Sequence, residues 1–279
     1  MAKIRVVTDS ACDLPDDLSK ELGITVVPLS IRFGEEEFTD REDLTPTEFW
    51  AKCKSSKVLP ETAAPSPGAF QQAFAAAKAE GYDGVLALTL SSGLSATFQA
   101  ATLGADAVKG DIDVRVVDSQ AVTMAQGLLA IEAASRAAEG ATLDDLVAYV
   151  EQMIPKAGVM GTLDTLEHLI KGGRLKGAKA LLGSVLAIKP LLELKAGMIV
   201  EAGRQRTRAK ALATCVAAAQ SAAPLRRLAL VHGSASDVAA VEAALQDVKT
   251  EFPLVVADMG SVVGTHGGPG TAVVCWIRA

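Results

Sequence analysis

The stretch that decides the fold is Val85-Leu86-Ala87-Leu88-Thr89-Leu90-Ser91-Ser92-Gly93-Leu94-Ser95-Ala96-Thr97-Phe98-Gln99-Ala100. Its apolar beginning predicts a buried strand, and its end enters an Ala-rich run with helical spacing. Three serines and a glycine occupy the turn between strand and helix. Ligands of open α/β sheets bind at the carboxyl ends of strands, and the free N–H groups of a helix start attract anions. The turn therefore predicts an anion site, or a simpler role in which Ser95 only caps the helix.

Strands and helices alternate on both sides of this stretch. Residues 4–8 and 114–118 are further apolar runs, and each precedes a helical pattern. This alternation predicts a mostly parallel, doubly wound α/β sheet. A length of 279 residues favours two lobes. We expect a hinge near residues 155–158, with an N-terminal α/β lobe over residues 1–156 and a C-terminal α/β lobe over residues 157–279.

The composition argues against several classes of partner and compartment. A net charge of −6 without a long basic run argues against nucleic acid. The four cysteines lack metal-type spacing and are expected to be reduced thiols in a cytoplasmic protein. The chain runs directly into its first strand, which leaves no room for a signal peptide. No apolar stretch is long enough to span a bilayer, although transient contact with a membrane surface remains open.

Other polar residues near strand ends are candidates for the same site. Asp9 and Ser10 follow the first strand, where either a functional role or local turn chemistry is consistent with their position. Thr62 is the only hydroxyl residue between two prolines, in a segment expected to be extended and exposed.

Among the three histidines, His266 is the best candidate for function. It lies in the glycine-rich stretch 264–270, expected to be a loop in which backbone and imidazole approach a ligand closely. His168 lies on a Leu-striped helix and is expected to have a packing or surface role, and His232 ends a strand and is ambiguous.

The familiar catalytic and cofactor motifs are absent. The sequence has no Gly-x-Ser-x-Gly elbow, no Gly-rich nucleotide motif, and no His/Cys/Glu spacing for a metal, so we expect neither cofactor nor metal. The basic cluster Arg204, Arg206, Arg208 and Lys210 stands at an expected helix start, where the helix dipole disfavours cations. We therefore expect a bound anion or an acidic partner to balance this cluster.

Several short blocks, taken in order, resemble the DegV family. Their order and spacing carry the resemblance, which runs from about residue 4 to the last strand. The blocks are Thr8-Asp9-Ser10, Asp13-Leu14-Pro15, Thr62, Pro65-Ser66, Ser91-Ser92-Gly93-Leu94-Ser95-Ala96-Thr97-Phe98-Gln99, Asp118-Ser119, Lys171-Gly172-Gly173-Arg174, Lys189-Pro190, Arg206-Thr207, Lys210-Ala211, His266 and Gly268-Pro269-Gly270.

The resemblance implies a protein that holds one long-chain fatty acid between two lobes and has no catalytic activity of its own. It implies that a separate bacterial fatty acid kinase uses ATP to convert the presented carboxylate into acyl phosphate, a link to phospholipid metabolism. A composition rich in aliphatic residues, with only 4% aromatic residues, suits a long alkyl chain better than a planar ligand.

The resemblance also assigns expected roles to single residues. Thr62 and Ser92 would bind the carboxylate, with two further serines and a histidine close by, whereas two arginines would lie near the site or face the kinase. The ligand-binding set is Thr62, Ser91, Ser92, Ser95 and His266, and the arginines are Arg174 and Arg206. The family usually has Ser-Gln where this chain has Ala63-Ala64, which implies a different hydrogen-bond network around the carboxylate.

Two other functions compete with lipid binding. A stand-alone serine hydrolase or acyltransferase would use Ser92 with His266. A binder of a sugar or dihydroxyacetone phosphate is suggested by analogy of fold alone. An activated-ester probe would label only the hydrolase, and only the lipid binder would carry fatty acid.

Overall fold

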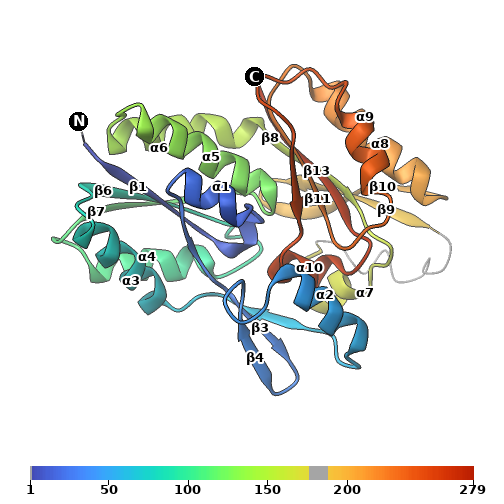
Figure 1. Cartoon of the computed structure of the whole chain (residues 1–279), viewed down its shortest axis with the longest axis horizontal. Helices are drawn as coiled ribbons and strands as arrows, with labels where there is room; N and C mark the ends of the chain where they lie inside the picture. The colour runs from blue at the N-terminus through green and yellow to red at the C-terminus, as the bar shows by residue number, and fades with distance from the viewer. Residues whose placement is uncertain (1, 176–187) are drawn as a thin grey trace.

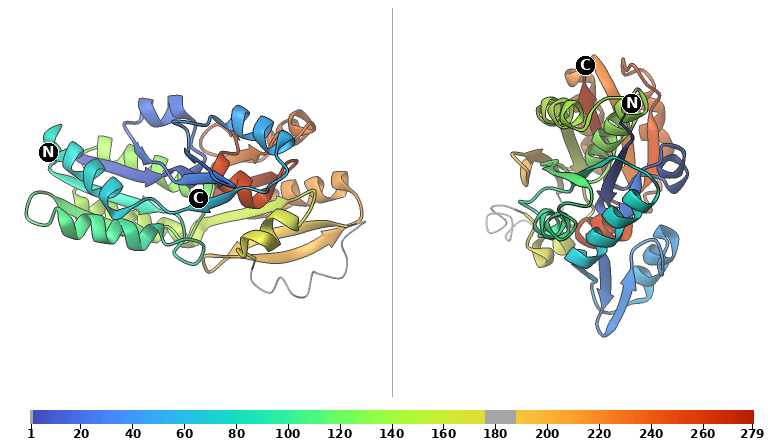
Figure 2. Two further views of the ribbon diagram at one scale, coloured as in Figure 1. Left: turned by 90° about the horizontal axis from the view of Figure 1, so that it is seen from below. Right: turned by 90° about the vertical axis from the view of Figure 1, so that its left-hand side faces the viewer.

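The computed structural model describes residues 2–175 and 188–279, which form three β-sheets with helices packed around them (Figures 1 and 2). The N-terminal lobe is a parallel sheet whose strands follow the spatial order β2 (Thr25–Val27), β1 (Ile4–Asp9), β6 (Gly84–Thr89) and β7 (Asp113–Asp118). Every residue of β6 is buried, as expected for a strand that helices cover on both faces.

Helices cover both faces of this sheet, so the expected doubly wound architecture is confirmed. α3 (Pro67–Ala79) and α4 (Thr97–Ala107) lie against one face, and α5 (Met124–Ala138) and α6 (Leu143–Met153) against the other (Figure 1). The short η1 (Ser10–Cys12) and α1 (Asp16–Glu21) follow β1.

A small antiparallel sheet projects from the N-terminal lobe (Figure 1). Its strands follow the order β4 (Glu36–Thr39), β3 (Ser30–Phe33) and β5 (Glu61–Ala63), and α2 (Pro46–Ser55) connects β4 to β5. Thr45 and Glu48 form a capping box at the start of α2, as their spacing predicts. The segment around Thr62 is extended, as expected between two prolines, but Thr62 itself is half-buried, because it pairs with Ile31 of β3 as part of a short strand.

The C-terminal lobe is a six-stranded mixed sheet among the described residues. Its spatial order is β10 (Met198–Gln205), β9 (Lys189–Lys195), β8 (Ala157–Thr162), β13 (Ala272–Arg278), β11 (Leu225–His232) and β12 (Val255–Asp258). β11 and β12 are parallel and the other pairs antiparallel. Its helices are α7 (Glu167–Gly172), α8 (Arg208–Ala222), α9 (Val238–Leu245) and α10 (Ser261–Gly267), and η2 (Ile154–Lys156) precedes β8.

Helix α5 packs against both lobes. It contacts β1 of the first sheet and β11 and β13 of the second, and one apolar core cluster contains residues of both sheets, such as Leu88 and Val273. Glu132 of α5 is 1% exposed and accepts hydrogen bonds from Arg226 (2.7 Å), Arg227 and Tyr149. A carboxylate buried with two arginines and a hydroxyl therefore ties α5 to the start of β11.

Candidate functional site

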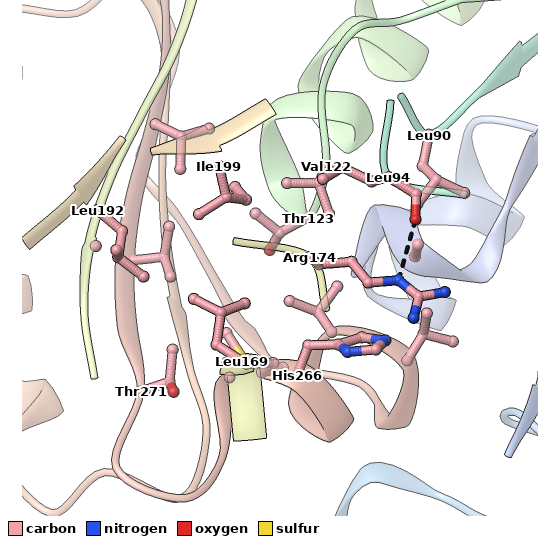
Figure 3. A pocket seen from close by; sticks show the side chains of 18 of the residues that line it. Leu90, Leu94, Val122, Thr123, Leu169, Arg174, Leu192, Ile199, His266 and Thr271 are labelled. Atoms are coloured by element: carbon pink, nitrogen blue, oxygen red, sulfur yellow. Dashed lines mark hydrogen bonds between the residues drawn. The ribbon is translucent and has the colours of Figure 1, made fainter. Parts of the chain in front are cut away.

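An aliphatic cavity lies between the two lobes, beside the carboxyl ends of β1 and β6 (Figure 3). The N-terminal lobe contributes Leu90 and Leu94 from the turn after β6, and the C-terminal lobe contributes Leu169, Leu192 and Ile199. The free space, including its opening, is about 870 Å³.

The nitrogen-bearing side chains of the cavity lie together at one end, which we call the polar end. Figure 3 shows the imidazole of His266 and the guanidinium of Arg174 at that end, with Leu192 and Thr271 at the other. Thr62 also lines the cavity, and its Oγ1 lies 3.0 Å from His266 Nε2. A chain with one polar end and a long apolar tail matches this distribution of side chains.

A second hollow adjoins the polar end on the outside. It shares Thr62, Arg174 and His266 with the cavity, and its outer wall includes the exposed side chains of Glu61 and Lys171. A group bound at the polar end therefore lies next to a polar surface depression rather than deep in the core.

Helix α10 places His266, which corrects the expectation of a glycine-rich loop. Residues 261–267 form a helix, and His266 stands in its last turn. Two of its glycines are needed for packing, because a Cβ on Gly264 would lie 2.7 Å from the Phe49 ring and one on Gly267 2.9 Å from Thr271 Oγ1. Glycines that usually indicate a loop are here tolerated within a helix because other elements pack directly against its backbone.

Burial keeps His266 neutral. Desolvation lowers the pKa of its imidazole to about 4, and the nearby charge of Arg174 acts in the same direction. Its Nδ1 is buried and has no hydrogen-bond partner among the described residues. A proton on Nε2 would donate to Thr62 Oγ1 and leave no ring N–H unpaired. In this tautomer the Thr62 hydroxyl proton is free to donate to an anion in the cavity.

The three serines of the turn after β6 have different environments. Ser95 lines the cavity, and its hydroxyl lies 2.9 Å from that of Thr97. The helix begins one residue later than a Ser95 cap would give, at Thr97 with Ala96 as its cap residue. Ser95 is therefore not the N-cap residue, although its hydroxyl accepts a hydrogen bond from the backbone N–H of Thr97 at 3.3 Å, and the residue lines the cavity.

The structure does not bring Ser91 and Ser92 to the cavity. The Ser92 hydroxyl is exposed and donates to Asp118 Oδ2 at 2.5 Å, and the buried Ser91 hydroxyl donates to the carbonyl of Gly197 at 2.7 Å. His266 is bonded to Thr62 instead of Ser92, so the Ser92–His266 pair that a hydrolase would need is not formed. The turn's rotation decides which serine faces the ligand space, and the sequence does not indicate that rotation.

The acidic residues after β1 have structural roles in the walls of the cavity. Asp9 accepts hydrogen bonds from the backbone of Leu90 and the side chain of Gln126, and Asp13 accepts from Thr123 Oγ1 and the backbone of Gly260. Burial raises the pKa of both Asp9 and Asp13 to about 7, while these hydrogen bonds act in the opposite direction. Asp13 thereby joins the start of α5 to the residue that precedes α10.

The basic cluster is balanced within the chain at two of its arginines, so the expectation of a bound anion is wrong for them. Arg204 pairs with Glu201, and Arg208 donates to Asp237 at 2.6 Å and to Asp164 at 3.1 Å. Arg206 differs, because it is exposed and makes no hydrogen bond or ion pair with another described residue. It precedes Thr207, which caps α8.

Sequence analysis missed most of the apolar wall. Leu192 and Ile199 come from the antiparallel hairpin of β9 and β10. Alternation of apolar and polar residues along these strands indicates that one face is buried. The pattern does not indicate whether a ligand or other side chains cover that face. No group of His, Cys, Asp or Glu among the described residues could hold a metal ion. Within the same residues, no helix is long and apolar enough to cross a membrane.

Comparison with known proteins gives one consistent result. The model of the DegV family, described as "Uncharacterised protein, DegV family", matches residues 3–279. A DegV domain-containing protein of Listeria monocytogenes is 36% identical over 98% of both chains. Two similar structures are a fatty-acid-binding DegV family protein from Thermus thermophilus (35% identity, 99% of each chain, TM-score 0.89) and DegV, a fatty acid binding protein from Bacillus subtilis (31%, 99% of each chain, 0.88).

Proposed function

This chain belongs to the DegV family, and on that premise we propose that it binds one long-chain fatty acid between its two lobes. The alkyl chain occupies the aliphatic cavity, and the carboxylate lies at the polar end formed by Thr62, Ser95, Arg174 and His266. The observation that carries the proposal is the pairing of an almost wholly aliphatic cavity with a Thr62–His266 hydrogen bond at one end. The fatty-acid-binding relatives support the same ligand class.

The energetics are consistent with tight binding. Burial contributes about 0.8 kcal/mol per methylene, so a tail of about fourteen methylenes gains roughly 11 kcal/mol. Association costs about 4–15 kcal/mol in lost freedom, and hydrogen bonds to a carboxylate add about 1.5–3 kcal/mol each. These magnitudes allow micromolar or tighter affinity.

The direct test is mass spectrometry of an organic extract of the purified protein. We expect about one fatty acid per chain, or stoichiometric uptake of added oleic acid after delipidation. A water-soluble phosphate ester supplied in the same assay should not compete. Extracts without lipid, together with no uptake of oleic acid, would overturn the proposal.

We further propose that the carboxylate is presented to a separate ATP-dependent kinase, which forms acyl phosphate. The polar hollow beside Thr62 and His266 supports this, because it gives an outside reagent access to the head of the ligand. Lys171 and Arg174 line this hollow, and cations there would favour a phosphate. Arg206 is an exposed arginine without a partner among the described residues and is available for the kinase or its ATP.

The chain itself is not proposed to be an enzyme. Thr62, His266 and Arg174 can hold an anion. The Thr62 hydroxyl does pair with His266, but burial lowers the pKa of this imidazole to about 4, and its Nδ1 has no partner among the described residues, so the third group of a catalytic triad is missing there. Three of the four cysteines are buried free thiols, which supports the proposed cytoplasmic location, where thiols stay reduced.

A further inference from the structure

The turn after β6 and the β9–β10 hairpin meet at a seam beside the cavity. Leu94 and Ser95 of the turn and Leu192 and Ile199 of the hairpin line the cavity from different sides. Separating the turn from the hairpin would therefore move these lining residues apart and widen the space that holds the alkyl chain. What holds this seam decides how readily a ligand enters and leaves.

The seam is held by a buried hydrogen bond from the Ser91 hydroxyl to the carbonyl of Gly197, at 2.7 Å. Gly197 stands at the tip of the hairpin, where Ala196 and Gly197 both have positive φ, as in the tight two-residue turns that join antiparallel strands. Ser91 is 1% exposed, so this bond is shielded from water.

Glycines on both sides let the two backbones approach each other closely. A Cβ on Gly197 would lie 2.6 Å from Ser91 Oγ, and one on Gly93 would lie 2.6 Å from Met198 Sδ and 3.0 Å from the Gly197 carbonyl. Opening the seam therefore separates the Met198 side chain from Gly93 and breaks the Ser91 hydrogen bond. Among the described residues, a second and longer hydrogen bond ties the turn to the C-terminal lobe, 3.3 Å from Arg174 Nε to the carbonyl of Leu94.

The α5 part of the lobe interface is held far more strongly. Glu132 is buried there with two arginines, and the apolar core runs through α5 into both sheets. Glu132 lies eight residues after Met124, about 12 Å along α5 from the cavity wall. Opening at α5 would leave a buried carboxylate without its arginines, whereas opening at the seam breaks one neutral hydrogen bond from Ser91 and one long hydrogen bond from the Arg174 guanidinium.

We propose that Ser91 is a latch: its hydrogen bond to Gly197 holds the β9–β10 hairpin closed over the bound alkyl chain, and fatty acid exchanges when this bond breaks. The proposal rests on the proposed function and adds a positioning residue that sets exchange rates. Because the latch is present with and without ligand, its loss raises the association and dissociation rates together. A residue that contacts the carboxylate would raise the dissociation rate alone.

The test is stopped-flow exchange of cis-parinaric acid, with oleic acid as the chase, on wild type, Ser91→Ala and Gly197→Ala. Losing one neutral hydrogen bond should accelerate both rates roughly two- to tenfold in Ser91→Ala. In Gly197→Ala the new methyl group collides with Ser91 Oγ, so the association and dissociation rates should both rise, as in Ser91→Ala. Ser135→Ala is the matched control, because that hydroxyl bonds the carbonyl of Ile131 within α5, and both rates should equal those of wild type.

Hydrogen–deuterium exchange of the hairpin tip provides a readout without ligand. Faster exchange at residues 196–198 in both variants supports the latch, and wild-type exchange in both overturns it. Wild-type binding rates in Ser91→Ala, or a change in the dissociation rate alone, also overturn the latch and leave fatty acid binding intact. A wild-type protein that takes up no cis-parinaric acid overturns the proposed function and the latch together.

Discussion

Replacing Thr62 with Val tests the placement of the carboxylate most sharply. Thr62 belongs to β5 and pairs with Ile31, and Val has the same branched shape, so the strand is preserved. The substitution removes one hydroxyl, whose oxygen lies 3.0 Å from His266 Nε2. In the assigned tautomer this hydroxyl accepts from His266 and donates to the carboxylate.

The two lost hydrogen bonds affect different quantities. The bond to the carboxylate exists only in the complex, so its loss of about 1.5–3 kcal/mol raises the dissociation constant about ten- to hundredfold. The bond to His266 exists with and without ligand, so its loss lowers the free energy of unfolding by about 1–3 kcal/mol and leaves the affinity unaffected. The buried alkyl chain should preserve measurable residual binding.

The assay combines calorimetric titration of delipidated protein with oleic acid and urea unfolding of the same samples. Thr102→Val is the control, since its hydroxyl bonds the carbonyl of Phe98 within α4 and does not line the cavity. We expect Thr102→Val to bind oleic acid with wild-type affinity. If Thr62→Val bound oleic acid within twofold of wild type, the carboxylate would not lie at Thr62.

Two further predictions address the arginine and the histidine. Arg206→Ala should retain wild-type affinity for fatty acid but lose most acyl phosphate formation with the cognate kinase and ATP. The control is Lys210→Ala, a change at another exposed residue nearby, which should reduce product formation less. Full product formation by Arg206→Ala would contradict the proposed role of Arg206. His266 has a pKa of about 4 when folded against about 6.5 when unfolded, so only the unfolded chain takes up its proton between these values. The unfolding free energy should therefore fall by roughly 3 kcal/mol as pH drops from 6.5 to 4. His266→Gln, which keeps Asp9 and Asp13, should lack this component in urea unfolding, and identical pH profiles would refute it.

The sequence predicts those parts of the fold that short-range patterns determine. The all-apolar run before Thr89 is a fully buried strand, and Thr142 with Asp145 forms the expected capping box of α6. Alternating strands and helices give the parallel sheet. In each case the residues that carry the pattern are neighbours in the chain.

The geometry of the candidate site depends on contacts that local patterns do not indicate. Thr62 belongs to a strand because Ile31 is available as a partner, thirty-one residues away. His266 lies in a helix despite its glycines, since Phe49 and Thr271 pack against their backbone. The basic cluster was interpreted from the helix dipole alone, and Arg208 finds Asp164 and Asp237 only in the folded chain.

The position of α5 between the sheets determines how the molecule unfolds. Its residues share one apolar cluster with Leu88 on one side and Val273 on the other, and Asp13 ties its start to Gly260. Truncating the chain between the two sheets would expose an apolar face of α5 and leave Glu132 without Arg226 and Arg227. We therefore expect the two lobes to unfold together in one cooperative transition rather than as two independently folding domains.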